Sequence, residues 1–179
     1  AGNIDAVHNE LHGALDHARW WLATESVPSA TQPLTIIASM LSDAAYPQVP
    51  ILKSELLQRE KPSSSAMAAM RELCYAMLRN GARENLGFSG YPAEMGLYIT
   101  ILAAAGLHGA NEDGTFGFQP PDVGTEVGCS LIAAWSVLGD VDEARLDEIY
   151  ALWASPPFGI KAGIMPVLAL AIMLARREH

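Results

Sequence analysis

Residues 66–80 read AMAAMRELCYAMLRN, and this stretch decides the fold class. Its apolar residues recur at steps of three and four, which is the period of one face of an α-helix. One of the serines just before it can cap such a helix by accepting a hydrogen bond from a free backbone N–H, and Gly81 is a suitable stop. We therefore predict a helix over residues 66–80, with one face formed by Met67, Met70, Leu73, Cys74, Met77 and Leu78.

Working outward, the same period predicts further helices over residues 3–24, 34–45, 51–59, 93–105, 126–138, 143–154 and 162–177. Residues 25–33, 46–50, 87–92 and 155–159 hold the prolines, glycines and serines typical of connections. Residues 107–118 differ, because Asp113-Gly114 favours the tight turn of a β-hairpin. The most apolar run, Ile164 to Ala175, is shorter than the roughly 20 residues that cross a bilayer, and we expect a buried core helix.

The fold class expected is therefore mainly α: a multi-helix domain of about eight helices with one small β-hairpin. Residues 1–30 would form an N-terminal helix and linker. The order of elements over residues 34–121 is compatible with a winged-helix-like unit, and residues 122–179 would form a C-terminal helical unit packed on it. In such a unit the helix at 66–80 would be the recognition helix, although it offers few groups that could read bases.

Composition narrows the function classes. The chain has 179 residues, half of them hydrophobic, with 11 basic and 20 acidic residues and a net charge of −9. Nucleic-acid binding depends largely on Lys and Arg neutralising phosphates, so this balance disfavours a broad nucleic-acid surface. Cys74 and Cys129 each lie in an apolar helical context, which predicts buried free thiols in a reducing compartment, and we expect a cytoplasmic location. Because the most apolar run is too short to cross a bilayer, we expect no membrane partner.

No pattern of residues indicates catalysis. His8 and His12 have the four-residue spacing of a metal pair, but Asn9 stands where a zinc protease needs glutamate, which favours solvated helix residues. The many carboxylates are tied to no nucleophile. A Gly-Lys-Ser/Thr phosphate loop and a Gly-x-Ser-x-Gly elbow are both absent from the sequence. We expect no catalytic, cofactor-binding or metal-binding residue.

Positive charge is concentrated between residues 53 and 83. A surface there could contact an acidic partner, whereas the interleaved glutamates also allow ordinary pairing along helix surfaces. The candidate contact residues are Lys53, Arg59, Lys61, Arg71, Arg79 and Arg83.

Three stretches carry a resemblance. Residues 50–59 resemble Pro-Val-x-x-Asn-Glu-Leu-x-Asn-Arg, residues 90–108 resemble Gly-Tyr-Pro-Pro-Glu…Tyr…Gly-Leu-His, and residues 156–168 resemble Pro-Pro-Phe-Gly-Leu-Lys-x-Gly-x-x-Pro-x-Leu. In this order they resemble a helical region of very large bacterial P-loop ATPases of phage-defence and DNA-modification islands, such as the bacteriophage-exclusion type. Ser54 and Gln58 depart from the usual asparagines, and Ala93 from the usual proline.

The resemblance implies a helical module of a larger ATPase whose partners are other domains of that protein or other defence proteins. It assigns no function to individual positions. The same motifs also have structural uses: Gly159 allows a sharp bend, Gly163 lets a neighbouring backbone approach, and Pro166 fits the first turn of a helix. Three function classes remain: a non-catalytic interaction module, a winged-helix-type DNA-contacting module, and a stand-alone enzyme, which only scattered carboxylates and histidines support.

Overall fold

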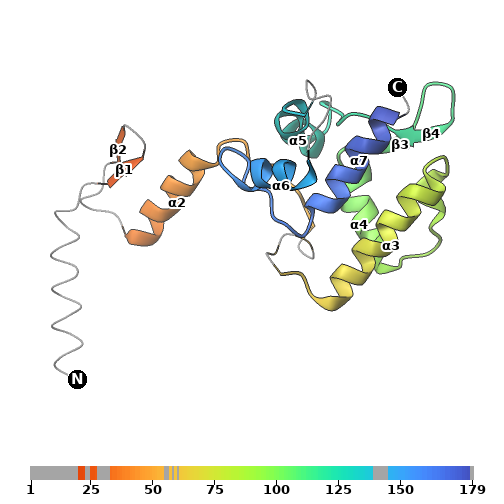
Figure 1. Cartoon of the computed structure of the whole chain (residues 1–179), viewed down its shortest axis with the longest axis horizontal. Coiled ribbons are helices and arrows are strands. Elements are labelled where there is room, and N and C mark those ends of the chain that lie inside the picture. Colours follow the sequence, from red (N-terminus) through yellow and green to blue (C-terminus); the bar gives the residue numbers. More distant parts are fainter. Residues whose placement is uncertain are drawn as a thin grey trace. The chain divides into compact units, whose positions relative to one another are not determined.

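The computed structural model describes residues 20–22, 25–27, 33–54, 57, 59, 61–138 and 145–177 (Figure 1). The chain divides into two compact units, residues 1–47 and residues 48–179. The described part is mainly helical, with six α-helices and two small antiparallel hairpins. This confirms the predicted fold class, and the winged-helix comparison stays a hypothesis.

The first unit contains a hairpin that the sequence did not predict. Strands β1 (Trp20–Leu22) and β2 (Glu25–Val27) pair antiparallel, with Trp20 opposite Val27. The helix expected over residues 3–24 is therefore wrong at residues 20–22, and residues 3–19 lie outside the described residues. The expected loop at 25–33 is likewise wrong where β2 runs. Aromatic and β-branched residues favour strands, and the helical period of the neighbouring apolar residues hid this preference.

Helix α2 (Leu34–Ala45) has the bounds expected from the sequence. It begins directly after Pro33, whose backbone is extended, and ends at Tyr46, which has left the helical region. Tyr46 precedes Pro47, and a proline ring disfavours helical geometry in the residue before it. The prolines on both sides therefore set the length of this helix.

The second unit begins with a segment that is not helical. The helix expected over residues 51–59 is wrong, because residues 51–54 have no regular secondary structure. The Ile51 N–H donates to Ser130 Oγ at 2.8 Å, and Lys53 pairs with Glu126. The Leu52 N–H donates to the Pro50 carbonyl at 3.1 Å, so the segment forms a non-helical turn that is held to a distant part of the chain.

Helix α3 (Ser64–Asn80) confirms the predicted helix and its cap, since Ser63 Oγ accepts from the Ala66 N–H at 3.2 Å. Its buried face differs from the prediction. Met67 and Leu78 are exposed, and alanines face inward in their place. The small alanine side chains let neighbouring elements pack closely against α3. The helix therefore turns its alanine-containing side toward those elements. It consists of Ala66, Ala69, Met70, Leu73, Ala76 and Met77.

After a short 3₁₀ turn, η1 (Glu84–Gly87), helix α4 (Ala93–Leu97) runs into a π-helical stretch, η2 (Tyr98–Ala103). Gly106 follows with φ 68°, so the expected helix and its stop are both found. Strands β3 (His108–Ala110) and β4 (Phe116–Phe118) then form the predicted hairpin, with His108 opposite Phe118.

Three helices complete the unit: α5 (Glu126–Ser136), α6 (Leu146–Ala154) and α7 (Met165–Arg177). Helix α7 packs against α3, α6 and β4, as Figure 1 shows. As expected, the run from Ile164 to Ala175 is largely buried, although Met173 is exposed. Pro166 lies in the first turn of α7, where its missing donor costs little.

Candidate functional site

The predicted contact residues have different surroundings in the structure. Lys53 Nζ lies 2.7 Å from Glu126 Oε2, and both side chains are largely exposed. The hydrogen bond from Lys53 and its charge lower the pKa of the Glu126 carboxyl. Lys53 therefore tethers the segment before α3 to α5. Arg59, Lys61 and Arg83 are exposed at the two ends of α3.

Arg71 and Arg79 lie on the outer face of α3, which combines positive charge with exposed apolar side chains. The guanidinium of Arg79 lies over the ring of Tyr75, 5.4 Å from its centroid. Tyr75 is 46% exposed and Leu78 is 60% exposed, and Met67 belongs to the same face. Residues 71, 75 and 78 have the i, i+4, i+7 spacing of one helix stripe. We call Met67, Arg71, Tyr75, Leu78 and Arg79 the outer face of α3.

Charge is distributed unevenly around this face. Residues 59–84 hold five basic and three acidic residues, a net charge of +2. The rest of the chain holds six basic and seventeen acidic residues, a net charge of −11. The outer face of α3 therefore lies in the positive segment of an acidic protein, and sequence reasoning found its charges but placed Met67 and Leu78 in the core.

A buried polar cluster joins three elements. His108 is 2% exposed; its Nδ1 lies 3.1 Å from the Tyr98 hydroxyl and its Nε2 lies 2.7 Å from the Gly81 carbonyl oxygen. Burial raises the pKa of Tyr98, and the negative charge of Glu84 adds to this. The Phe118 ring lies 4.8 Å from His108, centroid to centroid. With both ring nitrogens engaged and little access to solvent, His108 links α3, η2 and the hairpin.

The structural role of His108 was not predicted from the sequence. Two signals pointed to it: its place between Leu107 and Gly109 at the start of the hairpin, and its presence with Tyr98 in the second stretch of the resemblance. The two histidines considered for metal binding, His8 and His12, lie outside the described residues. Among the described residues, no group of three or more His, Cys, Asp or Glu side chains could hold a metal ion.

The two cysteines are free, but only one is partly buried. Burial raises the pKa of the Cys74 thiol, as expected for a thiol packed against the core. Cys129 is exposed, so its expected burial is wrong. It lies in the first turns of α5, on the side away from Val127 and Gly128, which face the core. None of the described helices is long and apolar enough to cross a membrane.

Two of the stretches that carry the resemblance meet in space. The Gln48 N–H donates to the Pro157 carbonyl at 3.1 Å. A Cβ at Gly163 would lie 2.6 Å from Pro62 Cγ and would also strike the Leu57 carbonyl, so only glycine permits this approach. The expected role of Gly163 is therefore confirmed, and the bend at Gly159 has φ 62°.

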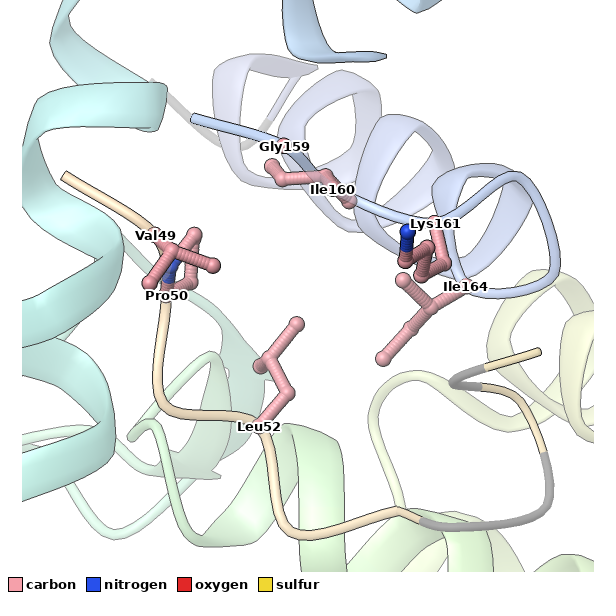
Figure 2. A pocket seen from close by; sticks show the side chains of 7 residues that line it. All are labelled: Val49, Pro50, Leu52, Gly159, Ile160, Lys161 and Ile164. Carbon is pink, nitrogen blue, oxygen red and sulfur yellow. The ribbon is translucent and has the colours of Figure 1, made fainter. Parts of the chain in front are cut away.

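A small pocket opens where these stretches meet (Figure 2). Its cavity volume is about 80 Å³. Side chains of Val49, Pro50 and Leu52 face those of Ile160, Lys161 and Ile164 across it. Its lining consists of Val49, Pro50, Leu52, Gly159, Ile160, Lys161 and Ile164.

Comparisons with models of protein families, with curated proteins and with solved structures found no match to this chain. The site is therefore described by its own geometry: an apolar and basic helix face, a buried histidine cluster and a small apolar pocket.

Proposed function

We propose that this chain is a non-catalytic helical interaction module of a larger bacterial ATPase, acting in the cytoplasm in anti-phage defence. The outer face of α3 would dock on an acidic helical surface of another domain or protein of the same complex. The observation that carries this proposal is the exposure of Tyr75 and Leu78 between Arg71 and Arg79 on one helix stripe. The parent system is proposed from the sequence resemblance alone.

The chemistry of this stripe suits a protein partner. Interface centres are enriched in aromatic residues, methionine and arginine, and the outer face of α3 contains all three. Arg71, Tyr75 and Leu78, at positions i, i+4 and i+7, form one row that can pack against the side-chain rows of a second helix. Because guanidinium groups pair well with carboxylates, Arg71 and Arg79 would select an acidic partner and fix its orientation.

The segments that carry the resemblance support the same class of function. Their prolines and glycines take part in packing within the second unit, as at Gly163, which favours a scaffold role for these motifs. Docking would then be the task of the residues that the scaffold leaves outside, and the outer face of α3 consists of such residues.

The alternative is a DNA-contacting module of the winged-helix type. The exposure of Arg71 and Arg79 on the helix that would enter the groove favours it. The acidic balance of the chain opposes it, because phosphate contacts supply most of the affinity for DNA. Met67, Tyr75 and Leu78 also lie where a groove-reading helix would present polar groups.

Site-specific photocrosslinking in cells that carry the complete native gene neighbourhood tests the proposal. A crosslinker at position 78 should capture an acidic surface of another part of the same complex, and the charge reversals Arg71→Glu and Arg79→Glu together should abolish the product. A crosslinker at Met173, which is exposed on α7, is the matched control.

Binding to a duplex DNA at two salt concentrations separates the two candidates. The interaction module should show weak or no binding that Arg71→Ala and Arg79→Ala leave unchanged. An affinity that falls steeply with salt and drops in both variants would establish the DNA-contacting alternative instead.

A further inference from the structure

The pocket at residues 49–52 and 159–164 has an apolar interior and a single charge at its mouth. Leu52, Ile160 and Ile164 are buried and form the interior. Val49 is 52% exposed at the rim, and the neighbouring Ile51 is also exposed. Among the described residues of the lining, Lys161 is the one that carries a charge, and it is exposed. Figure 2 shows it on the same side of the pocket as Ile164.

Both walls are held in place without a ligand. On one side, the Ile51 N–H is bonded to Ser130 Oγ and the Gln48 N–H to the Pro157 carbonyl. On the other side, the Ile160 N–H donates to the Trp153 carbonyl at 2.8 Å. A site whose walls are fixed before binding loses little conformational entropy when it is filled.

The size of the pocket selects the ligand. A cavity of roughly 150 Å³ holds one benzene ring. The volume here, about 80 Å³, therefore suits three or four carbon atoms, which is the size of a valine or leucine side chain. Cofactor pockets are several times larger, roughly 300–1,000 Å³. Whatever enters must be the tip of a ligand whose remainder lies outside, along Val49 and Ile51.

The positive charge of Lys161 determines which group of a ligand can lie beside the apolar tip. Within the described residues, Lys161 makes no ion pair, and the lining holds no carboxylate to neutralise it. An anionic group next to the apolar tip would therefore meet a cation at the mouth. A neutral or positively charged group at the mouth would gain no electrostatic attraction to Lys161.

We propose that this pocket binds one branched aliphatic side chain of a partner peptide segment, with an adjacent carboxylate of that segment paired to Lys161. The site shares no residue with the outer face of α3. It is a second docking point, independent of the function proposed above.

The test uses the full chain, labelled at the methyl groups of isoleucine and leucine, and the blocked peptide acetyl-Gly-Leu-Asp-Gly-amide. Titration should shift the methyl signals of Leu52, Ile160 and Ile164 in a saturable way. Replacing the leucine of the peptide by alanine should weaken binding about tenfold, because most of the buried apolar surface is lost. Replacing its aspartate by asparagine should weaken binding about two- to fivefold, as for an exposed ion pair.

Protein variants complete the test. Lys161→Gln should erase the difference between the aspartate and asparagine peptides, and Val49→Glu should abolish binding by placing a like charge at the rim. Lys61→Gln is the matched lysine control and should change nothing, because Lys61 is exposed and is not among the described residues of the lining. Unchanged spectra of the free variants establish that they are folded. The proposal is overturned if the alanine peptide binds as well as the leucine peptide, if Lys161→Gln has no effect, or if free 4-methylpentanoate binds more tightly than the peptide.

Discussion

The substitution Gly128→Ala adds one methyl group and tests whether the cost of close packing exceeds the gain in helix propensity at this position. A Cβ there would lie 2.7 Å from the Ala105 carbonyl oxygen and 2.8 Å from Thr125 Oγ1, and it would also strike the Asp122 carbonyl. Alanine is favoured over glycine in a helix by about 1 kcal/mol. Overpacking costs about 1–3 kcal/mol, and losing the Thr125 cap costs about 1 kcal/mol more. We expect Gly128→Ala to lower the free energy of unfolding by about 1–3 kcal/mol.

Thermal and urea unfolding measure this effect, which should lower Tm by about 3–10 °C for a chain of this size. Gly96→Ala is the matched control, since Gly96 lies in helix α4 and a Cβ there would meet nothing within 4 Å. It should leave Tm unchanged or raise it by a few degrees, through helix propensity alone. If Gly128→Ala were as stable as Gly96→Ala, the close approach of α5 to the Ala105 carbonyl would be wrong.

Three further changes test other contacts. His108→Ala should lower the free energy of unfolding, measured in urea, by about 2–4 kcal/mol, because it removes the ring that bonds the Tyr98 hydroxyl and opens a cavity. A variant as stable as the natural protein would contradict a structural role for His108. Trp153→Phe should cost about 1–3 kcal/mol, because the indole N–H bonds a backbone carbonyl of α5 inside the core. Lys53→Met should raise the pKa of Glu126 in a carboxyl NMR titration, since the ion pair lowers it. The stability that this pair contributes is present at neutral pH and is lost as the pH falls through the pKa of Glu126 in the folded protein.

Elements with a strong local signal could be predicted from the sequence. Helix α2 lies between two prolines, α3 starts at a serine cap, and the hairpin turns at Asp113-Gly114. In each case the residues that set the boundary act within a few positions of the chain. Local chemistry was sufficient there because no distant contact competes with it.

The segment at 51–54 could not be predicted in this way. Its apolar spacing suits a helix, but its hydrogen-bonding and charged groups are engaged by α5, more than 70 positions away. The strand at Trp20 to Leu22 shows a related failure, since its pairing with β2 replaces the helical pattern. The pocket follows from the first of these cases, because Val49, Pro50 and Leu52, which are not coiled into a helix, form one of its walls.

Both proposed contact sites include residues that the local pattern misplaced. Met67 and Leu78 fit the apolar period of α3, yet small alanines took the core positions and turned these side chains outward. Val49 is half-exposed and precedes a segment that has no regular secondary structure where a helix was expected. Sequence rules tend to fail at functional positions, where apolar groups are kept available for a partner at some cost to the free chain. Large apolar side chains left outside at two independent places therefore agree better with a docking module than with a self-contained enzyme domain.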